Sequence, residues 1–520
     1  MSLELTGKDA VRESYDRVPY PSGSVHSAHP DNLATRALLF GLEPPDLRRL
    51  RVLELGCADG GNLLAMASEL PEGRFLGLDL SPRQIEDGRR RLAALEIGNV
   101  ELRAMSVLDV DASLGEFDYI LAHGVFSWVK PEVQEAILRI CRENLAPRGV
   151  AYISYNTFPG WHQRAMVREM MLFHTRGIED LYVRGEKSLA FLGLLAEAAA
   201  PGDESHAKLL RSRYEHLAGY GDRPSYLIHE YLEESNEPFY FHDFVARAGR
   251  HGLQYLADAE NELAEIEAFP PPVAERLRAA SRDRVELEQN LDFAVNRTFR
   301  RSIVCHEGLP LQWAMVPERL RRCHAASSVR PESAEPDVRS GAGEAFRGER
   351  DRAFVVSHPP TKALLVALAE VWPRSLAFDE LLDRLQVEVA LLADILFSLY
   401  CGGYLDLHLL PPLCTERVSE RPLASPLARR EAARGPIVTN QRRHILKLDD
   451  ELARMVLLHL DGTRDRAALR EVLVREAEEG RLGIEAGGEP LRSSERLGPI
   501  LDALVDQTLK KMAGLALLVG

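Results

Sequence analysis

The fold is decided by the stretch Arg51-Val-Leu-Glu-Leu-Gly-Cys-Ala-Asp-Gly-Gly-Asn62. The apolar residues over 52–55 are typical of a buried parallel strand, and the glycines that follow them are typical of a turn. The apolar run over 63–67 then predicts the start of a helix. A strand, a glycine turn and a helix together predict a nucleotide-type site. Small residues let the backbone approach a ligand, and a helix N-terminus carries about half a positive charge.

A second apolar strand is predicted over 75–79, ending in an acid roughly 20 residues after the first strand, where a carboxylate can accept from both ribose hydroxyls. A dinucleotide site would require glycine in place of Ala58, because the backbone there must leave room for pyrophosphate. The pattern E-x-G-x-(G/A)-x-G is satisfied instead, by Glu54, Gly56, Ala58 and Gly60. This pattern is similar to the first motif of the class I S-adenosylmethionine-dependent methyltransferases. The resemblance implies S-adenosyl-L-methionine as the cofactor.

Strands and helices continue to alternate after this motif. Further strands are predicted over 99–105, 117–122 and 149–155, with a capped helix starting at Pro82 and an amphipathic helix over 131–144. Such alternation predicts an α/β fold with a doubly wound, Rossmann-like parallel sheet. These sheets bind ligands at the carboxyl ends of their strands, which is where the polar clusters of this sequence fall.

Length and composition exclude several classes. The chain has 520 residues, enough for two to four domains, and a formal charge of −15, which disfavours nucleic acid and anionic membranes as partners. The N-terminus lacks the basic and apolar regions of a signal peptide, and no apolar run approaches the roughly 20 residues of a membrane span. The six cysteines show no C-x-x-C spacing, and no set of acids has metal-ligand spacing. We therefore expect a cytoplasmic protein without membrane insertion and without a metal.

The periodicity changes along the chain and predicts six segments. We expect a cofactor-binding domain over 1–160, a mostly helical region over 161–324, a linker over 325–352, a winged-helix-like module over 353–414, a second linker over 415–435 and a C-terminal α/β module over 436–520. Both linkers are expected because they are rich in charge and turn-forming residues and hold few large apolar side chains.

Three further motifs carry a family resemblance: Leu78-Asp-Leu-Ser-Pro-Arg-Gln-Ile, His123-Gly-Val-Phe-Ser-Trp and Tyr155-Asn-Thr-Phe-Pro-Gly-Trp161. With the first motif, they resemble bacterial methyltransferases that carry a methyltransferase regulatory domain. The lysine methyltransferases that modify rickettsial outer-membrane proteins belong to this group. The segment 288–306 resembles the end of the regulatory domain, and the resemblance covers about 10–310. It implies a methyltransferase whose leading acceptor is a protein lysine.

The resemblance also implies a role for individual cofactor-site residues. The glycine turn would pack on the amino-acid part of the cofactor, and Glu54 would orient its ammonium end. Asp79 would accept from the ribose hydroxyls, unless it only caps a helix. Ser106 would lie at the adenine edge, where Asp109 is the alternative. The expected cofactor-binding residues are Tyr15, Glu54, Gly56, Ala58, Gly60, Asn62, Asp79, Leu80, Ser106, Val107, His123 and Gly124.

The acceptor side is expected at the end of the fourth strand. The D/N-P-P-Y/F motif shared by amide and adenine N-methyltransferases is absent there. His123 is the candidate general base in this motif, although a lone histidine at a strand end is often structural. The side chains of Trp128, Tyr155 and Trp161 are expected to form an aromatic wall that binds a cation or a lysine stem, or to be ordinary core residues.

The winged-helix-like segment raises the alternative of a DNA-binding regulator. Residues 355–411 hold three basic side chains (Lys362, Arg374, Arg384) and seven acids, a net charge of −4 that opposes phosphate binding. We expect a surface for protein docking, possible homodimers included. The predicted function is methylation of lysine side chains in a protein. The alternatives are O- or N-methylation of a small natural product and cofactor binding by a regulator without catalysis.

Overall fold

The structure is a computed structural model. It describes residues 16–18, 22–199, 204–220, 224–233, 235–260, 266, 269–312, 316–348, 352–483, 485–486, 489–490 and 494–520.

A seven-stranded sheet forms the centre of the molecule, with the strand order β3-β2-β1-β4-β5-β7-β6. The first five of these pair in parallel, and β7 runs antiparallel to both of its neighbours. This confirms the predicted doubly wound sheet. Its strands are β1 (Arg51–Leu55), β2 (Arg74–Asp79), β3 (Val100–Ala104), β4 (Phe117–Ala122), β5 (Leu145–Asn156), β6 (Leu253–Asp258) and β7 (Phe299–His306).

The region 161–324, which was expected to be mostly helical, also contributes the strands β6 and β7 to the sheet. The sequence pattern concealed β7 in particular. Arg300 lies in β7 and is fully buried, with its guanidinium 2.7 Å from Asp292. A buried arginine that is paired in this way looks like a surface residue in the sequence, so the alternation of a strand is lost.

Helices cover both faces of the sheet. Val52 packs in the core under α2 (Pro30–Leu39), α3 (Gly61–Glu69) and α4 (Pro82–Ala94), and the next residue, Leu53, packs on the opposite face with α5 (Pro131–Glu143) and α10 (Phe241–Arg250). This alternation follows from the two-residue repeat of a strand. Short 3-10 turns connect these elements: η1 (His26–Ala28), η2 (Val107–Asp109), η3 (Ala112–Leu114) and η4 (Phe126–Trp128).

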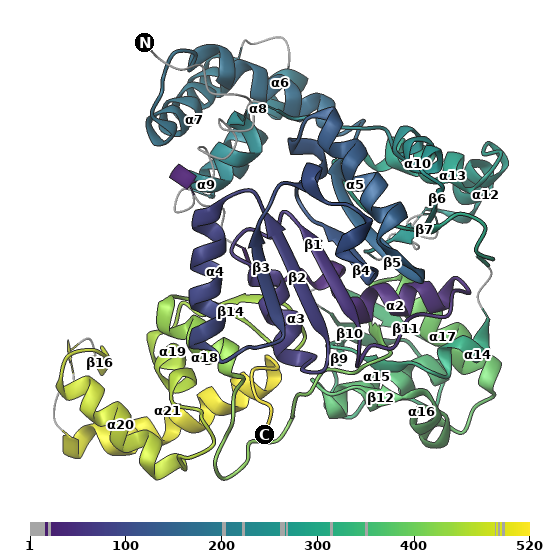
Figure 1. Ribbon diagram of the computed structural model, residues 1–520. Coiled ribbons are helices and arrows are strands. Elements are labelled where there is room, and N and C mark those ends of the chain that lie inside the picture. Colours follow the sequence, from purple (N-terminus) through teal and green to yellow (C-terminus); the bar gives the residue numbers. More distant parts are fainter. Residues whose placement is uncertain are drawn as a thin grey trace.

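A group of helices lies on the carboxyl side of the sheet, at the top of Figure 1. It has a core of its own, which includes Val18 from the N-terminal segment. The group consists of α6 (Trp161–His174), α7 (Leu181–Ala198), α8 (Glu204–Ala218), α9 (Pro224–Leu227) and the π-helical turn η5 (Ile228–Leu232). The helices α12 (Pro271–Ala279) and α13 (Arg284–Val295) lead into β7. Within the described part of the chain, no helix is both long enough and apolar enough to cross a membrane.

Two further modules lie below the sheet in Figure 1. The first has a three-stranded sheet of β8 (His324–Ala326), β12 (Leu376–Ala377) and β13 (Asp406–His408), and its helices are α14 (Pro317–Leu320), α15 (Pro359–Val371), α16 (Phe378–Leu385) and α17 (Val389–Cys401). The second comprises α18 (Pro426–Arg434), β14 (Ile437–Thr439), β15 (Ile445–Lys447), α19 (Glu451–Leu458), α20 (Arg466–Glu478), β16 (Glu485–Ala486), β17 (Glu489–Pro490) and α21 (Ser494–Gly514).

Both predicted linkers contain ordered elements, which corrects those two expectations. The segment 325–352 contributes most of β8, as well as β9 (Arg330–Pro331) and β10 (Glu344–Arg347), which pairs with β11 (Ala353–Val356). Its few apolar residues are sufficient to order these strands because they lie in the core of the module. Phe346, for example, is fully buried. The segment 415–435 contains the whole of the amphipathic helix α18, which packs on the core of the second module.

Candidate active site

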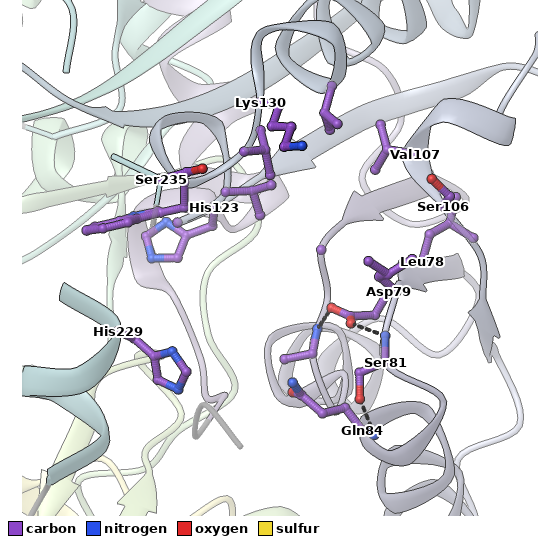
Figure 2. A pocket seen from close by; sticks show the side chains of 18 of the residues that line it. Leu78, Asp79, Ser81, Gln84, Ser106, Val107, His123, Lys130, His229 and Ser235 are labelled. Atoms are coloured by element: carbon purple, nitrogen blue, oxygen red, sulfur yellow. Dashed lines mark hydrogen bonds between the residues drawn. The ribbon is translucent and has the colours of Figure 1, made fainter. Parts of the chain in front are cut away.

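A cavity of about 300 Å³ opens at the carboxyl ends of β1, β2 and β4. Figure 2 shows its two sides. Asp79, Ser106 and Val107 lie on one side, and His123, His229 and Ser235 lie on the other. The first side comes from the sheet and its glycine turn, while the second combines the end of β4 with residues from the helical group.

The glycine turn has the backbone that the motif predicts. Gly56, Ala58 and Gly60 all have positive φ, at 74°, 51° and 72°. A Cβ on Gly56 would lie 2.4 Å from the side chain of Val125, so only glycine fits. The left-handed conformation of Ala58 is held by its N–H, which donates to Asp79 Oδ2 at 2.8 Å. Gly56 and Ala58 line the cavity, whereas Gly60 forms the N-cap of α3 and is not among the lining residues.

Asp79 fits the role of ribose acceptor. Its Oδ1 accepts from the N–H of Ser81 at 2.9 Å, which fixes the carboxylate at the cavity wall (Figure 2). Burial raises its pKa, and the N–H donors of Ser81 and Ala58 oppose that rise. Each carboxylate oxygen can accept more than one hydrogen bond, so both retain capacity for the hydroxyls of a ribose.

Glu54 and Asn62 lie behind the glycine turn, outside the set of lining residues. Asn62 donates to Glu54 Oε1 at 2.8 Å and accepts from the N–H of Val25 at 2.9 Å, so it braces the first strand instead of lining the cavity as expected. Glu54 is buried, and its Oε2 has no hydrogen-bond partner among the described residues. Burial raises its pKa to about 8. The expected role of Glu54 towards the ammonium end of the cofactor stays a prediction, because its side chain does not line the cavity.

Leu80, Ser106 and Val107, the residues expected at the adenine, all line the cavity. Asp109 is exposed and is not among the lining residues, so the geometry favours Ser106 of the two alternatives. Tyr15 lies outside the described residues. The N-terminal segment nevertheless reaches this side, because Ser81 Oγ donates to Asp16 at 2.5 Å.

His123 and Gly124 line the cavity at the end of β4. His123 Nδ1 lies 2.9 Å from the hydroxyl of Tyr152, and the Gly124 N–H donates to Ser154 Oγ at 2.7 Å. Burial lowers the pKa of His123 to about 4, and Arg301 adds to this effect. The imidazole is therefore neutral near pH 7 and a weak proton acceptor, which argues against the general-base role.

The expected aromatic wall is only partly present. Trp128 lines the cavity, and Trp161 packs edge-on behind it, with ring centroids 6.1 Å apart and 1% of its surface exposed. Tyr155 lies in the core under the sheet, stacked on Phe244 at 4.3 Å, with its hydroxyl 3.0 Å from Ser302. The expectation that Tyr155 borders the acceptor is thereby corrected. The side chains of β5 alternate between the faces, and this position faces the helices.

Sequence reasoning did not name several of the lining residues, and four of these come from the region expected to be mostly helical: His229, Glu230, Ser235 and Phe299. No local pattern marks these four. His229 and Glu230 reach the cavity from the helical group, and Ser235 and Phe299 reach it from the chain that follows, which is a property of the tertiary fold.

Three family models match the chain. A methyltransferase domain matches residues 53–151, the "Predicted methyltransferase regulatory domain" matches residues 223–306, and the "PKMT, C-terminal winged helix domain" matches residues 420–517. The four missed residues all fall within the second of these. The third covers most of the module that was expected to be α/β, so the family's winged helix lies later in the chain than the expected one.

Relatives match over almost the whole length. An uncharacterized protein of Rickettsia prowazekii is 31% identical, across 99% of this chain and 95% of its own length. The structure of PKMT2 from Rickettsia typhi, also solved in complex with AdoHcy, is 31% identical and covers 96% of this chain and all of its own, with a TM-score of 0.86. The chain belongs to this methyltransferase family. Together with the geometry of the cavity, the family establishes an S-adenosylmethionine-dependent methyltransferase.

Proposed function

We propose that the enzyme transfers methyl groups to lysine side chains of a protein. The observation that supports this best is the nearly full-length similarity to PKMT2, which extends beyond the methyltransferase domain into the C-terminal modules. The side of the cavity opposite the ribose site suits a lysine, since the Trp128 ring offers an apolar surface to an aliphatic stem.

Residues of this chain would hold the cofactor and the acceptor in place. Asp79 binds the ribose, Leu80 and Val107 contact the adenine, and the turn at Gly56 and Ala58 follows the amino-acid part. S-adenosylmethionine supplies an activated methyl group on a sulfonium for direct displacement, so catalysis depends mainly on alignment. The acceptor amine must be neutral when it reacts. With an ordinary lysine pKa near 10.4, deprotonation at pH 7 costs about 4.6 kcal/mol.

The C-terminal modules would recruit the substrate protein. In the first of them the three basic side chains of 355–411 are already engaged. Lys362 donates to the carbonyls of Ser340 and Ala342 at 2.8 and 2.9 Å, and Arg374 and Arg384 pair with Glu416 and Glu380. This leaves little positive charge for a phosphate backbone in the first module, which favours a protein partner over nucleic acid there.

Labelling of a cell lysate tests the proposal. The purified enzyme is incubated with a lysate and methyl-labelled S-adenosylmethionine, and the products are analysed by mass spectrometry. We expect label on lysine Nζ atoms of proteins. Label that is confined to the small-molecule fraction would favour a natural-product methyltransferase. An absence of both label and S-adenosylhomocysteine would favour a regulator without catalysis.

A further inference from the structure

The helical group places a π-helical turn at the wall of the cavity. The turn η5 spans five residues, and two of them, His229 and Glu230, line the cavity opposite the ribose side. Turns of this kind are rare and occur frequently at functional sites. Their wider hydrogen-bond spacing displaces side chains from the direction that an α-helix would give them.

His229 anchors this turn. Its Nε2 donates to the carbonyl of Val18 at 2.7 Å, and its Nδ1 lies 2.7 Å from Glu233 Oε1. The side chain is 3% exposed. Because both ring nitrogens are engaged, the ring is fixed in place, and the position of the neighbouring residue is fixed with it. The N-terminal segment and the helical group are thereby joined at the cavity.

Glu230 has no hydrogen bond or ion pair with any other residue that the structure describes. Its carboxylate nevertheless lines a cavity where burial is sufficient to raise its pKa. A carboxylate that is largely removed from water is costly unless a partner compensates it. The other acids of the cavity differ from it: Asp79 is bonded to backbone N–H groups, and Glu132 is exposed in the first turn of α5.

The aromatic residues extend from the acceptor side to this carboxylate. Trp128 contacts Trp161, whose ring lies 6.5 Å from that of Tyr231, the residue after Glu230. The guanidinium of Arg164 lies over the Trp161 ring, 5.7 Å from its centroid. An aliphatic stem against Trp128 would thus share the cavity with a carboxylate that no described residue hydrogen-bonds.

We propose that Glu230 binds the protonated amine of the acceptor and accepts a proton from it before methyl transfer. This role rests on the proposed function, because it requires an amine acceptor. An N–H bond of the ammonium breaks and the proton bonds to a Glu230 oxygen, which frees the nitrogen lone pair. The lone pair then forms the bond to the methyl carbon while the carbon–sulfur bond breaks towards sulfur. Glu230 releases its proton to water, so one proton leaves per methyl group.

The groups that face Glu230 determine how it titrates. Burial raises its pKa, while Arg164 from α6 and His229 from η5 lower it. Tyr226 from α9 and Tyr231 lie near enough for Glu230 to raise their pKa values. A raised pKa makes this carboxylate a stronger proton acceptor than an exposed glutamate. Glu230 attracts a cation above its pKa, where it is charged, and loses this attraction as the pH falls through the pKa and the carboxylate becomes protonated.

A pair of isosteric ligands tests the proposal without knowledge of the substrate protein. In both compounds, a nitrogen atom replaces the sulfur of S-adenosylmethionine. On this nitrogen, one compound carries an aminoethyl arm in place of the methyl group, and the other carries a propyl arm. Calorimetry at pH 7.5 should show that the wild-type enzyme binds the aminoethyl compound about 10- to 100-fold more tightly, the range expected for a charged hydrogen bond. Glu230→Gln should reduce this preference to less than about twofold.

Affinity for the propyl compound shows whether each variant is folded, and it should be unchanged in Glu230→Gln. Glu230→Asp, which keeps the charge, should retain part of the preference, and Glu132→Gln should retain all of it. A full preference in Glu230→Gln, or no preference in the wild type, would overturn the role of Glu230. If either result overturned the role of Glu230, label on protein lysines from a lysate would still leave the proposed function standing. Label only on hydroxyl acceptors would refute both.

Discussion

Asp31 and Arg443 are separated by 412 positions in the sequence and form a buried ion pair, with Arg443 Nη1 2.9 Å from Asp31 Oδ2. Each side chain is 1% exposed. Asp31 also accepts from His408 Nδ1 at 2.8 Å, and Arg443 also donates to Glu69 at 2.9 Å. Burial by itself would raise the pKa of Asp31, but Arg443 and His408 outweigh it and lower the pKa. The sheet domain and both C-terminal modules therefore meet at one carboxylate.

Arg443→Met should destabilise the protein strongly, because it leaves Asp31 buried and charged without its main partner. Removing one member of a buried pair costs about 3–5 kcal/mol. The midpoint of thermal unfolding should fall accordingly. Arg466→Met provides the matched control. Arg466 pairs with Asp506 at 2.7 Å on the surface, and its loss should cost less than about 1 kcal/mol. Similar shifts for both variants would argue against an essential role of the buried pair.

Asp79→Ala should weaken cofactor binding by about 10- to 100-fold, because it removes charged hydrogen bonds to the ribose. Calorimetry with S-adenosylhomocysteine measures the change. Asp109→Ala is the control, since Asp109 is exposed and lies outside the cavity, and it should bind normally. If Asp109→Ala were the weaker binder, the adenine edge would have to be reassigned. Unfolding of Asp79→Ala must be checked as well, because this carboxylate also holds Ala58.

Trp128 and Trp161 should respond differently to replacement by alanine. Trp128→Ala should raise the KM for the acceptor several-fold with little change in cofactor affinity, because its ring lines the cavity. Trp161→Ala should mainly lower stability, by about 3–5 kcal/mol, as expected for a buried tryptophan. Steady-state kinetics and thermal unfolding of both variants distinguish these effects. Equal kinetic defects at equal stability would place both rings in contact with the acceptor.

His123→Ala should retain most of its turnover and lose no more than about tenfold, whereas loss of a true general base costs about 100- to 10,000-fold. With a pKa of about 4, lowered by burial and Arg301, His123 stays neutral between pH 6 and 9. The rate should therefore show no inflection near pH 6.5 from this residue and should rise above pH 7, as more of the amine is neutral. A plateau near pH 7 that disappears in His123→Ala would establish the histidine as the base.

The intact protein should not bind DNA in a salt-sensitive manner. The formal charge of −15, the net charge of −4 over 355–411 and the engagement of the three basic side chains of that segment leave few cations to replace counterions. A gel-shift assay with duplex DNA at low and at physiological salt measures this directly. Binding that is tight at low salt and weakens steeply as salt is added would show a basic surface formed elsewhere in the fold.

Residues that are close together in the sequence accounted for the five parallel strands of the sheet and for the cofactor side of the cavity. The strand, the glycine turn and the helix after Arg51 each have a local signal, and β2 places Asp79 beside the turn because adjacent parallel strands end at the same edge. The family resemblance then implied that Gly56, Ala58, Leu80, Ser106 and Val107 belong to the site, and all five line the cavity. Backbone geometry and hydrophobic periodicity depend on residues that are near one another in the chain, so both can be recognised in the sequence without the tertiary structure.

The acceptor side and the domain junction depend on contacts between distant parts of the chain. Arg300 in β7 looks like a surface residue until Asp292 is placed against it, and Arg443 gives no sign that Asp31 is its partner. Glu230 reaches the cavity only because a π-helical turn after the helical group is anchored to Val18. A buried charge is tolerated only where the fold provides its counter-charge or a ligand. Its place is therefore decided by packing over long range, which the local pattern of residues does not record.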